Sequence, residues 1–488
     1  MASAADRRRL VAGLLAVLST AVLAWFGTGL TPFWPLLWLA PLPVLLFAGR
    51  ASARGTALVA ALAWFLGGLN LWHYFHGVLR VPPPVLLAIY VTPSVMFALA
   101  VLLHRALLRR GAYVSALLAF PALWVSFEYL LNVTSPHATG GNIAYSQLEF
   151  LPFLQLASLT GPWGMSFLLL SFSSAIAVGV HLRTRAPRQA RRLVAASMGV
   201  IALALVFGAV RLAMSPAGKP VRVALLASDP PASPAVADEG MPTTRLFQAY
   251  AEQAAKLAAR GAQAIVMPEK IGVMVDPDTG AGDAVFQALA DRIHAVVVVG
   301  LIHVAPPVKY NQARVYAPGA PVRSYDKEHM LPPFESKFEP GTALTLVSAP
   351  SGTWGVAICK DMDFTPLSRR YGAAGAGLLL VPAWDFNVDR WSHGHMAVMR
   401  GVESGFAVVR SAKNGYLTVS DDRGRILAQT TSDAAPFATL LATVPAVHDQ
   451  TLYLLAGDWF AQVAIVLLGF TLARCVQLRP LAPAAPST

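Results

Sequence analysis

Eight mostly apolar runs, each about long enough to cross a bilayer, are the feature that most constrains this chain. Seven precede residue 220 and the eighth lies near the C-terminal end. Their bounds are 10–27, 33–49, 56–78, 82–104, 112–132, 161–181, 193–213 and 457–474. Only 13% of the residues are charged, whereas soluble domains carry about 25%. We therefore expect a polytopic α-helical membrane protein with about eight spans.

Cationic residues gather on alternate sides of these runs, which predicts the topology. The opposite short loops contain only Arg80. The positive-inside rule then places the N terminus in the cytoplasm and residues 214–456 outside. Because the excess of the net +12 charge lies between apolar runs, it indicates topology and not a nucleic-acid surface. The residues on the cytoplasmic side are Arg7, Arg8, Arg9, Arg50, Arg54, Arg105, Arg109, Arg110, Arg183, Arg185, Arg188, Arg191, Arg192, Arg474 and Arg479.

The first run has a second interpretation. Its charged, apolar and small-residue regions follow one another as in a secretory signal peptide, which would be cleaved. Either interpretation leaves the sidedness of the later segments unchanged.

The segment between the seventh and eighth runs predicts a globular α/β domain. Buried-strand patterns such as 222–228, 264–269 and 295–302 alternate with amphipathic helical patterns at 243–261 and 286–294. We expect three parts: N-terminal transmembrane helices over 1–215, an extracytoplasmic domain over 216–447, and a last helix with a short tail over 448–488.

Three reactive side chains follow or end strands of this domain. Glu269 ends one strand, Cys359 ends another, and Lys327 follows a predicted hairpin strand. Strand ends face the crevice where open α/β sheets bind ligands. A thiol, a carboxylate and an ammonium group together can act as nucleophile, base and oxyanion stabiliser. Taken singly, each has an ordinary explanation: a buried small side chain for Cys359, a cap or surface carboxylate for Glu269, and a solvated amine for Lys327.

The order Glu269, Lys327, Cys359 resembles the nitrilase (carbon–nitrogen hydrolase) superfamily. The whole chain is similar to the apolipoprotein N-acyltransferase family, with eight spans and the nitrilase-like domain between spans seven and eight. The matching stretches are NIAYSQ (142–147), KEHMLPPFE (327–335), HMAVMRGVES (395–404), VVRSAKNGY (408–416) and TLYLLAGDW (451–459).

The resemblance implies an αββα sandwich and a two-step acyl transfer. Cys359 would take an acyl chain from a phospholipid as a thioester, and the α-amine of a diacylglyceryl-cysteine lipoprotein would then receive it. Glu269 would be the base, Lys327 would stabilise the oxyanion and Glu335 would orient Lys327. The resemblance implies no metal or organic cofactor and a location in the bacterial inner membrane, and we expect a monomer.

Further residues are candidates for supporting or substrate-binding roles. The family usually has Cys-Tyr-Glu where this chain has Cys359-Lys360-Asp361, so Lys360 and Asp361 are expected to support the nucleophile. A cation beside a thiol lowers its pKa or binds phosphate. The remaining candidates, expected to bind substrate, are Tyr145, Trp384, His395, Arg400 and Glu403. For the last four of these, packing or a buried Arg–Glu pair is an equally good explanation.

Two other functions remain open at the level of sequence. A membrane-anchored amidase or nitrilase-type hydrolase would use the same three residues but pass the acyl group from a small amide to water or a small amine. A non-catalytic scaffold would keep the fold without bringing Glu269, Lys327 and Cys359 together.

Overall fold

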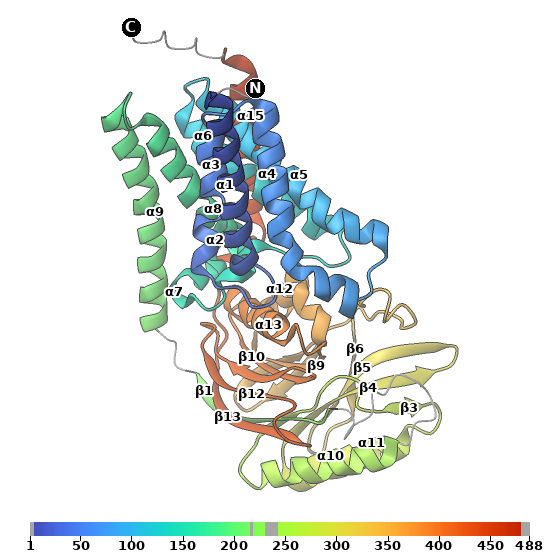
Figure 1. The fold of residues 1–488 in the computed structure, drawn as a ribbon. Coiled ribbons are helices and arrows are strands. Elements are labelled where there is room, and N and C mark those ends of the chain that lie inside the picture. Colours follow the sequence, from blue (N-terminus) through green and yellow to red (C-terminus); the bar gives the residue numbers. More distant parts are fainter. Residues whose placement is uncertain (1–3, 215–217, 230–242, 480–488) are drawn as a thin grey trace. The chain divides into compact units, whose positions relative to one another are not determined.

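The computed structural model describes residues 4–214, 218–229 and 243–479. These residues form two compact units (Figure 1). The helical unit comprises residues 1–134, 141–209 and 458–488, and the α/β unit comprises 135–140 and 210–457. The domain boundary expected between residues 215 and 216 lies outside the described residues.

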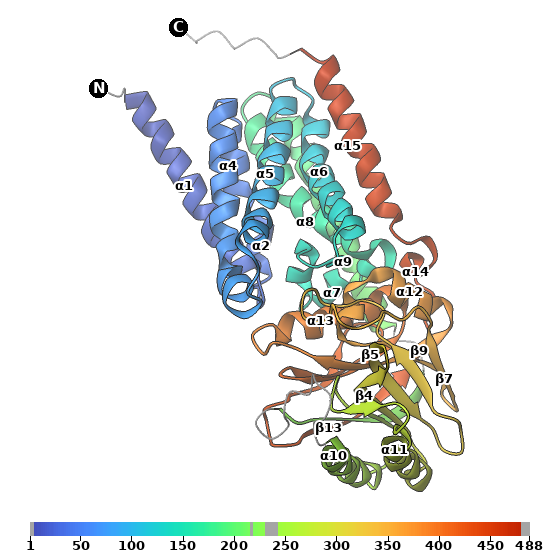
Figure 2. The same cartoon turned by 90° about the vertical axis from the view of Figure 1, so that its right-hand side faces the viewer.

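Seven helices in the described part of the chain are long and apolar enough to cross a membrane, which confirms the membrane class. They are α1 (Ala4–Gly27), α4 (Ala53–Gly68, continued to Leu71 by η1), α5 (Pro83–Leu108), α6 (Tyr113–Thr134), α8 (Ala157–Leu182), α9 (Pro187–Ala213) and α15 (Trp459–Gln477). The shorter elements are α2 (Pro35–Leu39), α3 (Leu42–Ala48), η1 (Leu69–Leu71), η2 (His73–Val78), η3 (Ile143–Gln147) and α7 (Leu151–Leu154). Figure 2 shows the long helices of this unit side by side.

The predicted span at 33–49 is not one long helix. It folds as α2 and α3, which are separate short helices. Pro41 lies between them and Pro43 follows in the first turn of α3. Because proline has no backbone N–H and disfavours the helical conformation in the residue before it, this sequence ends one helix and begins another.

A buried carboxylate organises the interior of the helical unit. Glu128 on α6 accepts hydrogen bonds from the Asn142 side chain at 3.0 Å and from the Ile143 backbone at 2.8 Å. The side-chain oxygen of Asn142 caps η3 by accepting a hydrogen bond from Ala144 N, and it also accepts one from the Ser166 hydroxyl of α8. Since an ionisable group inside a membrane helix is costly without partners, Glu128 fixes the position of η3.

The α/β unit contains two sheets. The first has the strand order β13-β1-β2-β4-β5-β6, with β3 paired to β4, and the second has the order β12-β11-β10-β9-β8-β7. The first-sheet strands are β1 (Lys219–Ala227), β2 (Ala264–Val266), β3 (Val273–Val275), β4 (Val296–Ala305), β5 (Val308–Tyr316), β6 (Arg323–Asp326) and β13 (Ala438–Ala446). Those of the second are β7 (Thr345–Ala349), β8 (Gly352–Val356), β9 (Ala376–Trp384), β10 (Ala407–Lys413), β11 (Tyr416–Ser420) and β12 (Ile426–Thr431).

The central strands of each sheet are parallel. In the first sheet β1, β2 and β4 run in one direction, and in the second sheet β8, β9 and β10 do so. Buried Val, Leu and Ala side chains from both sheets form one core between them. Parallel strands covered on both faces have the continuous apolar runs seen in the sequence.

Helices cover the outer faces of both sheets, which confirms the αββα sandwich. The helices α10 (Thr243–Ala258) and α11 (Gly280–Ile293) pack their apolar faces on the first sheet in a second core. The second sheet carries α12 (Thr365–Ala373) and α13 (Arg390–Ser404), and Figure 1 shows these layers. The remaining short elements are η4 (Cys359–Asp363) and α14 (Leu452–Ala456).

Candidate active site

Glu269 lies just beyond the carboxyl end of β2 and reaches the other sheet. Its backbone N–H donates to the carbonyl of Ala383 in β9 at 3.2 Å. The segment before it passes close to β4, where a Cβ on Gly300 would lie 2.5 Å from the Pro268 oxygen. A side chain at position 300 would therefore displace the backbone at Pro268 and Glu269.

Lys327 joins two buried carboxylates. Its Nζ donates to Oε1 of Glu269 at 3.0 Å and to Oε2 of Glu335 at 2.7 Å. All three side chains are no more than 3% exposed. Asn311 of β5 joins the same carboxylates, since its Nδ2 lies 2.5 Å from Glu269 Oε1 and 2.8 Å from Glu335 Oε1. The structure thus brings Glu269, Lys327 and Glu335 into direct contact.

A second lysine completes this network. Lys270 Nζ lies 2.6 Å from Glu335 and 3.5 Å from Glu269, so two ammonium groups face two carboxylates. Burial alone would raise the pKa of Glu335, but Lys327 and Lys270 lower it well below its usual range. Burial alone would lower the pKa of Lys327, but Glu269 and Glu335 raise it well above its usual range. Both groups are therefore ionised at neutral pH.

Cys359 does not end a strand, as the sequence suggested, but begins η4 three residues beyond the end of β8, in a left-handed backbone conformation with φ of 45°. It is partly exposed, and its Sγ lies 3.5 Å from the backbone oxygen of Trp384. Burial of the thiol and the nearby Glu269 carboxylate raise its pKa, although Lys327 and Arg410 act in the opposite direction. The resting sulfur is accordingly a protonated thiol at neutral pH.

The two residues after Cys359 do different things. The Asp361 carboxylate accepts hydrogen bonds from Ile358 N at 3.1 Å, from the Tyr325 hydroxyl at 2.8 Å and from His329 N at 2.9 Å. It thereby ties the turn at Cys359 to the segment that carries Lys327. Lys360 instead points to Asp363, at 3.2 Å, and to His137 Nδ1, at 3.3 Å.

The Asp361→Asn substitution is expected to loosen this turn. An amide has one acceptor oxygen in place of two, so at least one hydrogen bond to a charged acceptor is lost, at a cost of about 2 kcal/mol. We expect a lower thermal midpoint in detergent and slower alkylation of Cys359 by iodoacetamide. The matched control is Asp278→Asn in the β3–α11 loop. An unchanged midpoint and alkylation rate would show that Asp361 has no positioning role.

The candidate substrate-binding residues fall into three groups. Trp384 lies beside Cys359, as described above. His395 stacks on Trp391, with ring centroids 4.3 Å apart, and Arg400 pairs with Glu403 at 3.0 Å in the buried interior of α13. Tyr145 is buried in η3 and belongs to the helical unit.

Several residues of the site escaped the sequence analysis. Asn311 lies within a strand, and no sequence signal distinguishes it from other polar residues. Lys270 directly follows Glu269, and this position next to a candidate carboxylate is the signal that could have identified it. Arg410 forms a buried bidentate ion pair with Asp385, with N–O distances of 2.9 and 2.5 Å. Lys413, at the end of β10, packs on the Trp384 ring, 3.7 Å from its centroid. Within the described residues, no group of three or more His, Cys, Asp or Glu side chains is arranged to hold a metal ion.

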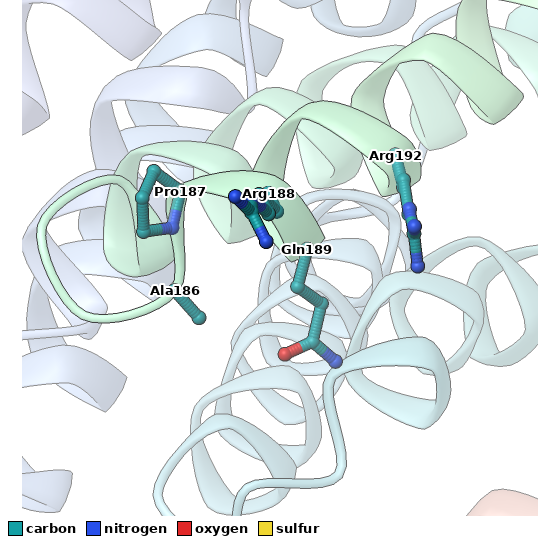
Figure 3. Close-up of a pocket in the computed structure, with 5 residues that line it drawn as sticks. All are labelled: Ala186, Pro187, Arg188, Gln189 and Arg192. Carbon is teal, nitrogen blue, oxygen red and sulfur yellow. The ribbon is translucent and has the colours of Figure 1, made fainter.

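A separate hollow of about 530 Å³ lies where α9 begins (Figure 3). Its lining comes from the turn before the helix and from its first residues, and includes the exposed Arg188 and Arg192. Glu269, Lys270, Lys327 and Glu335 together form what we call the carboxylate–lysine network. None of these residues lines the hollow. We assign no reaction chemistry to it.

Comparison with known proteins agrees with this architecture. Residues 12–175 match the family described as apolipoprotein N-acyltransferase N-terminal domain, and residues 241–453 match the carbon-nitrogen hydrolase family. The fold and site therefore define a membrane enzyme with a carbon–nitrogen hydrolase domain. The chain combines a domain of the apolipoprotein N-acyltransferase family with a carbon-nitrogen hydrolase domain, and it is an acyltransferase.

Curated relatives match along nearly the whole chain. The apolipoprotein N-acyltransferase of Geobacter metallireducens is 27% identical over 93% of both chains. That of Gloeobacter violaceus is 24% identical over 96% of both. Among solved structures, an amidase from Nesterenkonia sp. AN1 is 21% identical, with a TM-score of 0.40, over 50% of this chain and 95% of that one.

Proposed function

We propose that this enzyme transfers an acyl chain from a phospholipid to the N-terminal amine of diacylglyceryl-cysteine lipoproteins through a thioester on Cys359. The observation that carries the proposal is the contact of Lys327 with Glu269 and Glu335 in the unit that holds a partly exposed Cys359. The names of the relatives support a lipoprotein as acceptor. The seven membrane-length helices support a lipid as donor.

In the first half-reaction the Cys359 thiol attacks the ester carbonyl of the phospholipid. Glu269 takes the thiol proton as the carbon–sulfur bond forms, which a protonated resting thiol requires. The ammonium group of Lys327 stabilises the tetrahedral oxyanion, together with the backbone N–H of Lys360. When the carbon–oxygen bond breaks, Glu269 returns the proton to the leaving alcohol, and a lysophospholipid departs.

In the second half-reaction the neutral α-amine of the acceptor attacks the thioester. Glu269 takes one amine proton as the carbon–nitrogen bond forms, and passes it to the sulfur when the carbon–sulfur bond breaks. The products are an amide and the free thiol. Glu335 stays ionised throughout and keeps Lys327 aimed at the oxyanion.

The charge pattern of the sequence supports a location and an orientation for this reaction. We place the enzyme in the bacterial inner membrane with a cytoplasmic N terminus and the catalytic domain, residues 216–447, on the periplasmic side. The first part, residues 1–215, and the last, residues 448–488, supply the membrane helices. One chain contains the whole carboxylate–lysine network and Cys359, so we propose a monomer.

The test is intact-mass analysis of the purified full chain after incubation with phospholipid vesicles in detergent. We expect one acyl adduct that hydroxylamine removes and that is absent in Cys359→Ala. The matched control is Cys475→Ala, which removes the other cysteine and is expected to retain the adduct. An adduct that survives in Cys359→Ala would contradict the proposal.

The acceptor is tested on the preformed acyl-enzyme. A diacylglyceryl-cysteine peptide with a free amine is expected to discharge the adduct and gain one acyl chain, whereas its N-acetylated form should not. Discharge to free fatty acid with both peptides would instead indicate a hydrolase that uses the same residues.

A further inference from the structure

Lys413 is a buried lysine at the edge of the carboxylate–lysine network, and the mechanism above does not use it. Its side chain is fully buried. In the described part of the chain its ammonium group forms one hydrogen bond, to the backbone oxygen of Lys270 at 3.1 Å, and no ion pair. Lysine is almost never fully buried without a charged partner, so its retention here calls for an explanation.

The sheet topology places Trp384 between Lys413 and Cys359. The parallel strands β8, β9 and β10 are neighbours, and they are followed or ended by Cys359, Trp384 and Lys413 in that order. Lys413 and Trp384 are register partners, and the Lys413 ammonium lies 3.7 Å from the centre of the Trp384 ring. The Trp384 backbone oxygen in turn faces the Cys359 sulfur at 3.5 Å.

Lys413 also reaches across to the other sheet. The carbonyl that it holds belongs to Lys270, the residue directly after Glu269, and Lys270 has a left-handed backbone with φ of 52°. The Lys270 ammonium approaches the same Trp384 ring, at 5.4 Å. Lys413 thus links the segment that carries Glu269 to Trp384, whose backbone oxygen faces Cys359.

We propose that Lys413 is a positioning residue for Glu269, which holds the turn after it and sets the charge beside its carboxylate. The proposal rests on the proposed acyl transfer for the role of Glu269. It makes the balance of charge in the site depend on pH, through a residue that touches neither the thiol nor the carboxylate.

The surroundings of Lys413 explain why its charge changes near neutrality. Burial and the nearby Lys270 ammonium lower its pKa to about 7, although Glu269 and Asp229 act in the opposite direction. Asp229 itself accepts a hydrogen bond from Asn414 N at 2.8 Å.

The residue after Trp384 on the β9 side is Asp385, whose carboxylate forms an ion pair with Arg410 and not with Lys413. Below about pH 7 Lys413 therefore places a positive charge near Glu269, and above about pH 7 that charge disappears.

The test is the pH dependence of Cys359 alkylation by iodoacetamide, followed by intact mass in a Cys475→Ser background. In Lys413→Met, we expect the acidic limb of the rate profile to move to higher pH by about one unit. A shift of one unit corresponds to a change of up to tenfold in the rate at a given pH on that limb. At pH values below the limb, alkylation should be slower than in the parent by up to about tenfold, and at pH 8.5 the two rates should agree within about twofold.

The control is Lys256→Met, an exposed lysine on α10, which should leave the profile unchanged. An equal slowing at every pH would assign Lys413 a merely structural role, and no slowing would remove it from the site. Either result overturns the inference. Because alkylation needs neither lipid nor acceptor, it is independent of whether lipoprotein acylation is observed.

Thermal stability gives a second readout if alkylation is too slow to follow. The folded pKa of Lys413 lies below its value of about 10.4 in an unfolded chain. Between about pH 7 and 10.4 the unfolded state therefore binds more protons, so this residue makes the parent more stable as pH rises. We expect Lys413→Met to have the higher midpoint at pH 6.5 and to lose that advantage by pH 10. An advantage that does not change with pH would contradict the proposed charge state.

Discussion

Glu269→Gln is expected to form the Cys359 acyl adduct roughly 10³-fold more slowly than the parent, the size of effect that a lost general base produces. The amide oxygen still accepts from Lys327 and Asn311, which contact Glu269 at 3.0 and 2.5 Å. The local geometry is therefore retained, and what disappears is the group proposed to take the thiol proton. Because the pKa of the Cys359 thiol is raised, no alternative supply of thiolate exists at neutral pH.

The measurement is the time course of the adduct by intact mass at pH 7. Glu252→Gln is the matched control, since Glu252 is exposed on α10 in the same unit. Adduct formation in Glu269→Gln at a rate within tenfold of the parent would show that another group deprotonates Cys359.

Lys327→Met is expected to damage both stability and catalysis. Removing its ammonium group takes one partner from Glu269 and one from Glu335 in a fully buried site, and breaking such a pair costs about 3–5 kcal/mol. Loss of the oxyanion stabiliser should slow adduct formation by a further 10²–10³-fold, by analogy with removal of one oxyanion-hole donor. The thermal midpoint and the adduct time course measure the two effects separately.

A double substitution distinguishes the ion pair from a general defect in packing. In Lys327→Met with Glu335→Gln, no ionised carboxylate remains at position 335, so part of the lost stability should return while adduct formation stays slow. Lys270→Met should cost less than Lys327→Met, because Lys270 is 14% exposed and both carboxylates keep Lys327 as a partner. Equal losses for both lysines would contradict the central place given to Lys327.

Much of the fold was predictable because the signals are local. The apolar run at 222–228 is β1, shifted by a few residues, and the amphipathic pattern at 243–261 is α10. Proline chemistry, which is equally local, was overlooked at 33–49, where hydropathy alone suggested one span and the chain forms two short helices.

The site was predictable only in part. Glu269 and Lys327 could be singled out because their order with Cys359 along the chain matches a known set of three reactive groups. Asn311 and Lys413 have no such pattern and resemble many other polar residues within or at the end of strands. Their importance comes from contacts that join residues far apart in the chain, such as Asn311 with Glu269 and Lys413 with Lys270. No periodicity encodes a contact of that kind.

Hydropathy and charge, read along the chain, were enough to determine that membrane helices precede and follow an α/β domain in the sequence, because each depends on a short stretch of residues. Only the tertiary structure decided which charges share the site. Two sheets had to pack face to face before Glu269, Lys327 and Glu335 could neutralise one another away from water, and before Lys413 could lie against Trp384 without a carboxylate of its own.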